Sequence, residues 1–396
     1  MFSKKNFVTF LLLAGVFMIA AFAMPALATP QEVDETKYIA VVFSTGGLGD
    51  KSFNDAAYEG MQRAEADLDV EIAYIEPTTV TEINNGLESY AASTDPSYDL
   101  IIAIGFSSAD GVNASATAHP EKNFVIIDSV VALPNVASIT FKEHEGSFLA
   151  GAMAGMTTNT DKVAFLGGLD IPLINRFRAG FAAGAYYVNP NIEVMAQYSP
   201  DASNPWGDTA GGKEVANNFI EQGADVIYAA AGGTGLGVFD AVNETSKKNI
   251  FAIGVDSNQD YLQPGLILTS MIKRVDVAVE DEIGKVVDDT WDNGTIALGL
   301  AENGVGITEM EYTAEQKDAK WNDNQTRYEY AMELKKAIID GDIVVPEDPA
   351  NVNTVAQTTG LYGAEGLEEA ASGFGTFLAL AGLFTIAVVP VMRRRR

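Results

Sequence analysis

Cysteine is absent from the 396 residues, and histidine occurs only at His119 and His144. Without cysteine the chain cannot form disulfides, use a thiolate nucleophile or carry a lipid on an N-terminal cysteine. Two histidines are too few for a typical zinc site, although carboxylates alone could hold calcium. Neither a G-x-S-x-G elbow nor an H-E-x-x-H motif occurs. We therefore predict neither an enzyme nor a cofactor.

Basic residues are scarce as well. Lysine and arginine total 25 against 54 aspartates and glutamates, which gives a formal net charge of −29. Such a surface repels nucleic acid and anionic lipid, so nucleic acid is excluded as a partner. Long runs of one charge are missing and aromatic content is 9%, which is typical of a globular chain.

The N-terminus has the pattern of a secretory signal peptide. Lys4 and Lys5 precede an apolar stretch at residues 7–22, and Ala26-Leu27-Ala28 forms a small-x-small cleavage site. This order of charge, apolar core and small residues is typical of a signal peptide over residues 1–28. An uncleaved membrane anchor is the alternative.

The C-terminus has a second apolar segment. Residues 373–392 carry no charge, and four arginines follow at 393–396. A helix of about 20 residues spans the ~30 Å hydrocarbon core, and flanking arginines stay on the cytoplasmic side. We expect a protein held on the extracellular face of the cell membrane by a single C-terminal anchor. The tail also resembles archaeal C-terminal sorting signals, in which the apolar span is removed and replaced by a lipid.

Between these ends, short apolar runs alternate with helical patterns. The runs are continuous rather than alternating, as in strands covered on both faces. The predicted strands are residues 38–44, 71–77, 100–106, 124–129, 136–141, 163–168, 193–199, 226–232, 250–256 and 266–271. The predicted helices are residues 53–68, 80–92, 146–157, 173–188, 211–222, 234–245 and 275–291. The alternation predicts an α/β fold with parallel sheets, and its length predicts two lobes.

The stretch GGLGDKSFNDAAYEG at residues 46–60 joins a strand to a helix, as a phosphate loop would. A phosphate loop has lysine and serine or threonine directly after its last glycine, but Asp50 stands between Gly49 and that pair. A carboxylate repels phosphate and accepts hydrogen bonds, so the junction favours a neutral ligand with hydroxyl or amine groups. The pattern leaves open whether Asp50 or Ser52 merely caps the helix.

Other strands end in similar residues. Phe106, Asp128 and Asp256 each close an apolar run, a glycine-rich turn spans Gly232 to Gly237, and Lys273 follows the last run. In open α/β sheets, ligands bind beyond the carboxyl ends of the strands. These side chains together predict a polar pocket with flat apolar walls.

Six motifs occur in order: GGLGDKSFNDAAYEG, HEGSFLAGAMAG, RFRAGFAAGAYYVNP, GADVIYAAAGGTGLGV, IGVDSNQ and LTSMIKRVDVAV. Over residues 38–313 the chain resembles the basic membrane protein family, the PnrA-like purine nucleoside receptors of ABC transporters. The resemblance implies a type I periplasmic-binding-protein fold, in which two Rossmann-like lobes joined by three hinge crossings close on a ligand. It also implies that the nucleoside base stacks between aromatic rings, while carboxylates and a lysine hold base nitrogens and ribose hydroxyls.

Taken together, the strand ends and the resemblance predict nine ligand-binding residues. They are Asp50, Phe53, Asn54, Phe106, Asp128, Trp206, Gly232, Asp256 and Lys273. Trp206 has the loosest basis, since its loop varies in length within the family. The lipid-bearing cysteine of the family is missing, so the C-terminal segment would take over the anchoring role.

The predicted organisation follows from the two ends, the strand pattern and the resemblance. It comprises a signal peptide (1–28), lobe 1 (36–142), lobe 2 (143–255), a return to lobe 1 (256–298), a return to lobe 2 with a C-terminal helix (299–343), a linker (344–372), the transmembrane or sorting segment (373–392) and a basic tail (393–396). The implied partners are a purine nucleoside, an ABC permease and its ATPase, and the membrane. A sugar or other small polar ligand, a surface sensor and a nucleoside-processing enzyme are the alternatives.

Overall fold

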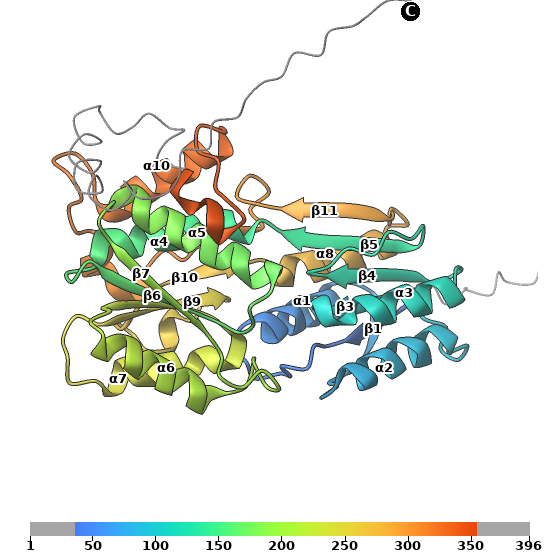
Figure 1. The fold of residues 1–396 in the computed structure, drawn as a ribbon. Helices are drawn as coiled ribbons and strands as arrows, with labels where there is room; N and C mark the ends of the chain where they lie inside the picture. The colour runs from blue at the N-terminus through green and yellow to red at the C-terminus, as the bar shows by residue number, and fades with distance from the viewer. Residues whose placement is uncertain (1–35, 355–396) are drawn as a thin grey trace, which may run out of the picture. The chain divides into compact units, whose positions relative to one another are not determined.

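The computed structural model describes residues 36–354, which form two six-stranded sheets (Figure 1). The predicted signal peptide, the apolar segment 373–392 and the arginine tail lie outside the described residues. No helix within residues 36–354 is long and apolar enough to cross a membrane.

The first sheet is parallel throughout. Its order is β11 (Gly294–Leu298), β5 (Val136–Phe141), β4 (Asn123–Ile127), β3 (Leu100–Ile104), β1 (Lys37–Val42) and β2 (Val70–Ile75). The second sheet has the order β12 (Val305–Ile307), β10 (Ile267–Lys273), β9 (Phe251–Asp256), β8 (Val226–Ala230), β6 (Lys162–Gly167) and β7 (Glu193–Tyr198). Only the β10–β12 pair in it is antiparallel. Continuous apolar strands require cover on both faces, and both sheets have it.

Helices cover the two faces of each sheet. On the first sheet, α1 (Phe53–Asp67) and α8 (Val275–Val287) pack with Ile39 and Val41, whereas α2 (Val80–Ala92) and α3 (Ala109–Ala118) pack with Ala40 and Val42. On the second sheet, α4 (Glu143–Thr157) and α5 (Pro172–Val188) cover one face, and α6 (Thr209–Glu221) and α7 (Gly235–Glu244) cover the other. Two further helices, α9 (Ala314–Lys317) and α10 (Arg327–Ile339), follow β12. Successive strand residues thus point into different cores.

Helices α1 and α8 approach closely because of one glycine. A Cβ added at Gly60 would lie 2.0 Å from the carbonyl oxygen of Asp276, at the start of α8. Any side chain at this position would push the two helices apart. These helices belong to segments far apart in the sequence, so Gly60 holds the returning part of the chain against the first lobe.

The chain crosses between the sheets after β5, after β10 and after β11. The prediction that the chain returns to lobe 1 at residue 256 is wrong for β10, because β10 pairs with β9 in the second sheet. The return begins only with α8, which starts two residues after Lys273. A strand that is covered on both faces has the same continuous apolar sequence in either sheet. The apolar run at 266–271 therefore could not show which strands lie beside it.

The ten predicted strands and seven predicted helices are all present, with ends shifted by a few residues. Four helices and strands were not predicted, namely β11, β12, α3 and α9, whereas the C-terminal helix predicted within residues 299–343 is present as α10. Strand β11 is an edge strand with mostly exposed residues, and β12 has three residues. Helix α3 consists largely of alanine, serine, glycine and asparagine, so its apolar face is weakly marked.

Candidate functional site

The nine predicted residues line a single cavity between the two sheets. The cavity encloses about 620 Å³ of empty space, including its open mouth, within the ~300–1,000 Å³ range of small-molecule pockets. Besides the nine, its lining consists of Ser44, Thr45, Gly105, Ser107, Leu173, Ile174, Phe177, Ala230, Ala231 and Val255. Strands from both sheets end here, as expected for ligand sites of parallel sheets.

Corresponding strands of the two lobes end in the same way. Asp128 follows β4 with a φ of 69°, and Asp256 ends β9 with a φ of 64°. Both backbones are therefore left-handed, a conformation that aspartate tolerates better than most residues but that still costs about 1 kcal/mol or more. Residues held in this way concentrate at functional sites because the surrounding structure must compensate for the strain. The turn brings each carboxylate to the cavity wall.

Lys273 is the buried cation of the site. Its Nζ lies 2.6 Å from Oδ2 of Asp128 and 3.2 Å from Oε1 of Glu143, and only 1% of its side chain is exposed. Glu143 is itself fully buried and accepts a 2.7 Å hydrogen bond from Nε of Arg176. Burial disfavours the charge on Lys273, but Asp128 and Glu143 outweigh burial and raise its pKa. Lys273 is therefore protonated at neutral pH.

Three aromatic rings surround the ammonium group. The Nζ of Lys273 lies 5.2 Å from the ring centroid of Phe53, 5.0 Å from that of Phe141 and 5.5 Å from that of Phe177. An ammonium within about 6 Å of a ring face is attracted to it, by up to ~2 kcal/mol when desolvated. The rings thus fix the head group of Lys273 at the floor of the cavity.

The buried cluster holds more carboxylates than cations. Lys273 and Arg176 face Asp128, Glu143 and Asp256, so the carboxyl groups outnumber the cations by one. Burial, only partly offset by Lys273 and by a 2.5 Å hydrogen bond from Oγ of Ser52, raises the pKa of Asp256 to about 7. The charge of Asp256 therefore varies near neutral pH.

Asp128 offers a free acceptor. Its Oδ2 is paired with Lys273, but Oδ1 is buried and has no hydrogen-bond partner among residues 36–354. A buried unpaired oxygen is unfavourable by ~1–3 kcal/mol or more when charged. Burial raises the pKa of Asp128, against the opposing effect of Lys273. A ligand N–H or O–H that reached Oδ1 would remove this penalty.

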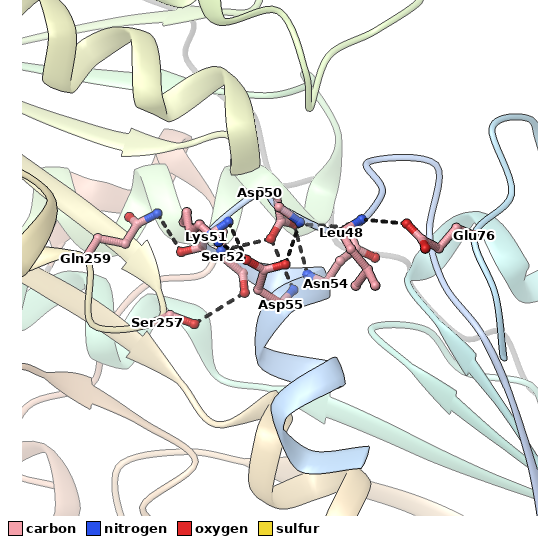
Figure 2. Close-up of polar contacts among 10 residues, drawn as sticks. Leu48, Asp50, Lys51, Ser52, Asn54, Asp55, Glu76, Ser257 and Gln259 are labelled. Atoms are coloured by element: carbon pink, nitrogen blue, oxygen red, sulfur yellow. Dashed lines mark hydrogen bonds and ion pairs between the residues drawn. The ribbon is translucent and has the colours of Figure 1, made fainter. Parts of the chain in front are cut away.

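Asp50, in contrast, has little acceptor capacity left. Its Oδ1 accepts hydrogen bonds from the backbone N–H groups of Ser52 (2.9 Å) and Asp55 (3.1 Å). Its Oδ2 accepts from the backbone N–H (2.9 Å) and Nδ2 (3.1 Å) of Asn54 (Figure 2). A carboxylate has about four lone-pair sites, so these four hydrogen bonds use the acceptor capacity of the Asp50 side chain. Of the two roles considered for Asp50, helix capping is the one observed, and the cap places Phe53 and Asn54 at the cavity.

Aromatic side chains from both lobes form the walls. Phe106, after β3, and Trp206, between β7 and α6, make an edge contact with ring centroids 6.4 Å apart and an interplanar angle of 71°. Phe53 and Phe177 lie at the Lys273 side of the same cavity. The arrangement presents flat apolar surfaces around a few polar groups.

Some members of the site depend on helix packing and were not predicted from the sequence. Phe177 lines the cavity, and Glu143 and Arg176 complete the ion network, from the N-terminal parts of α4 and α5. Arg176 and Phe177 lie in the RFRAG motif, but no spacing rule places that motif next to Lys273. A possible signal was the position of α5 after β6, because the start of such a helix faces the ligand end of the sheet. Within residues 36–354, no group of His, Cys, Asp and Glu side chains could hold a metal ion.

Comparison with known proteins agrees with this architecture. Residues 37–348 match the family described as ABC transporter substrate-binding protein PnrA-like. The ABC transporter nucleoside-binding protein BmpA of Lactococcus lactis is 34% identical over 341 residues, covering 81% of this chain and 92% of that protein. An uncharacterized lipoprotein of Pyrococcus abyssi is 38% identical over 295 residues, covering 72% of this chain and 71% of that protein. A crystal structure of an ABC transporter solute-binding protein from Aeropyrum pernix superimposes with a TM-score of 0.69 at 29% identity. The match covers 82% of this chain and 98% of that chain.

Proposed function

Because the chain belongs to the PnrA-like family of ABC-transporter substrate-binding proteins, we propose that it binds a purine nucleoside between its lobes. It then presents the loaded, closed form to the permease of an ABC importer. The relative from Lactococcus lactis, named as nucleoside-binding, supports this ligand class. Binding and release by lobe movement need no chemical step, so the proposal includes no enzymatic activity.

One observation carries the choice of ligand. The cavity combines four aromatic side chains with the unpaired Oδ1 of Asp128 next to Lys273. A flat base suits the aromatic walls, and base or ribose donors suit the free carboxylate oxygen. A phosphate group suits the site poorly, because Lys273 is already neutralised by Asp128 and Glu143 and the carboxyl groups of the cluster outnumber its cations.

The energies are sufficient for tight binding. Stacking of a base on an aromatic side chain contributes about 1–3 kcal/mol, and a hydrogen bond to a charged group contributes ~1.5–3 kcal/mol. Two rings and three such bonds contribute about 6.5–15 kcal/mol, a range that includes the ~8 kcal/mol of micromolar affinity and, in its upper part, also offsets association entropy. Asp128, Asp256 and Asn54 are the proposed polar contacts, with Asp50 as the residue that positions Asn54.

We also propose that the protein acts at the outer face of the cell membrane. The signal-peptide pattern at 1–28 and the apolar segment 373–392 with its arginines support export and a C-terminal tether. The related lipoprotein from Pyrococcus abyssi is consistent with a membrane-attached receptor. A tether keeps the receptor near its permease and raises the effective concentration of the loaded form.

Thermal-shift and calorimetric titration with guanosine, inosine, adenosine, uridine, ribose and galactose tests the ligand. We expect stabilisation by at least one purine nucleoside and none by ribose or galactose. A shift with a sugar alone would reassign the ligand class, and no shift with any nucleoside would refute the proposal. Incubation with inosine should release no free hypoxanthine.

Two matched tryptophan variants test the aromatic walls. Trp206→Ala should weaken nucleoside binding by about 5- to 150-fold, the equivalent of one lost stacking contact. Trp321→Ala removes a tryptophan that stacks on Tyr330 and does not line the cavity, so it should leave the affinity unchanged. Equal effects of the two variants would contradict the assignment of the cavity as the nucleoside site.

A further inference from the structure

The short segment after β9, residues 257–260, lies outside the cavity lining, yet two of its residues are buried. Gln259 and Asp260 are only 1% and 2% exposed. The Asp260 carboxylate accepts hydrogen bonds from Oγ of Ser270 (2.7 Å) and Oγ1 of Thr308 (2.6 Å). Buried polar groups are stable only when they are paired, and this pairing fixes the segment rigidly to the second lobe.

Gln259 is held in one orientation by its own lobe. Its backbone N–H donates to Oγ of Ser270 (3.0 Å), and its Oε1 accepts from the backbone N–H of Val255 (2.8 Å). The position requires a glycine beneath it, because a Cβ at Gly254 would lie 2.7 Å from Oε1 of Gln259. With Oε1 engaged, Nε2 is left to point away from the second lobe.

That Nε2 donates to the first lobe. It lies 2.9 Å from the carbonyl oxygen of Lys51, and Oγ of Ser257 donates to the carbonyl oxygen of Ser52 at 3.3 Å. Figure 2 shows both side chains reaching the main chain of the turn that begins α1. The two bonds join segments that are more than 200 residues apart in sequence and belong to different lobes.

The turn that accepts these two hydrogen bonds is held in place by contacts within its own lobe. Lys51 has a φ of 55°, and the carboxylate of Asp55 accepts from the backbone N–H groups of Gly49 (2.6 Å) and Lys51 (3.2 Å). Together with the bonds to Asp50, these contacts direct the carbonyl groups of Lys51 and Ser52 outward to the second lobe (Figure 2). The same turn carries Phe53 into the cavity, so the position of the turn affects both the ligand site and the lobe contact.

We propose that Ser257 and Gln259 form a latch that holds the two lobes together and slows ligand release without touching the ligand. The latch deepens the proposed function, since it matters only for a receptor that closes on a ligand. Its bonds exist only while the lobes are closed, so they stabilise the closed form selectively. A residue that stabilises only the closed form lowers the dissociation rate and leaves the encounter with the open form unaffected.

Gln259→Glu is the sharpest test, because the new side chain is isosteric. It keeps an oxygen to accept from Val255 and, as a carboxylate, places a second oxygen against the carbonyl oxygen of Lys51, so the contact between the lobes becomes repulsive. Gln222→Glu is the matched control. Gln222 also donates through Nε2 to a main-chain carbonyl, that of Asn218 at 3.1 Å, but within α6 and its cap. The milder Ser257→Ala is the second variant.

Stopped-flow tryptophan fluorescence of the full chain with guanosine gives the two rate constants. We expect Gln259→Glu to raise the dissociation rate about tenfold and Ser257→Ala about threefold, with association rates within twofold of the wild type. The tenfold change corresponds to ~1.4 kcal/mol. The control should change neither rate. Equal dissociation rates for wild type and Gln259→Glu, or a change confined to the association rate, would overturn the latch.

A second measurement separates the latch from the identity of the ligand. Since the chain has no cysteine, Asp110→Cys on α3 and Asp240→Cys on α7 give one exposed labelling site on each lobe. Single-molecule energy transfer without ligand should show a smaller closed fraction for Gln259→Glu than for wild type or Gln222→Glu. If guanosine does not bind, this difference still supports the latch. If the closed fractions are equal, the latch is refuted even when guanosine binds.

Discussion

Replacement of Lys273 by methionine tests the electrostatic design of the site. Methionine keeps most of the side-chain length and apolar packing but removes the charge that lies 2.6 Å from Asp128 and 3.2 Å from Glu143. Removal of one partner of a buried ion pair costs about 3–5 kcal/mol, because the remaining charge is left uncompensated. We expect the free energy of unfolding to fall by that amount, and nucleoside binding to weaken as well.

Guanidinium denaturation followed by tryptophan fluorescence measures the change. The loss should be smaller at pH 5 than at pH 8, because burial already raises the pKa of Asp128 and the unpaired carboxyl will protonate more readily as the pH falls. The double variant Lys273→Met with Asp128→Asn replaces the pair by two neutral groups and should regain part of the lost stability.

The cycle of Lys273→Met and Asp128→Asn also defines what would refute this reasoning. Contacting charges should show a coupling energy of at least about 1 kcal/mol in the double-mutant cycle. Strictly additive effects, or a loss below about 1 kcal/mol for Lys273→Met alone, would show that the buried network does not stabilise the fold. Arg176 and Glu143 remain paired in every variant, so they do not confound the comparison.

Two further predictions concern Asp256 and Gly60. The folded state raises the pKa of Asp256 to about 7, so it holds this proton more tightly than the unfolded chain does. The resulting stabilisation of the fold is complete below the ordinary pKa of 3.8 and is lost as the pH rises through 7. Urea denaturation should therefore show wild type losing roughly 2–3 kcal/mol between pH 5 and pH 8 relative to Asp256→Asn, and parallel profiles would contradict the assignment. Gly60→Ala should destabilise the fold by about 2 kcal/mol or more, because its Cβ would meet a carbonyl oxygen of α8. The control Gly284→Ala, whose Cβ would have no atom within 4 Å, should be neutral or stabilising by up to ~1 kcal/mol. Equal urea denaturation midpoints for the two variants would refute the close contact between the helices.

Much of the site could be predicted because parallel sheets gather their carboxyl ends. Once ten runs are recognised as buried strands, the residues that follow them lie at one edge, and Asp128, Asp256 and Lys273 were found in this way. The resemblance added Phe53, Asn54 and Trp206. Which of these residues contact a ligand is a prediction that the proposed titrations test.

The bonding of each side chain could not be predicted. Asp50 was read as either a ligand acceptor or a cap, and only the folded turn shows four donors converging on its two oxygens. Glu143 and Arg176 were not singled out, because their pairing depends on how α4 packs against α5. Gln259 gave no signal, since its partner is a main-chain carbonyl some 200 residues away.

The sequence by itself determined the class of fold, because continuous apolar runs alternating with helical periodicity can bury their side chains only in parallel sheets covered on both faces. It also determined which residues follow each strand. The tertiary structure alone decided that β10 stays with the second sheet, which carboxylates share Lys273 and Arg176, and how the two lobes touch. The reason is physical: local pattern records how a residue is buried, whereas pairing depends on what other parts of the chain bring to the same place.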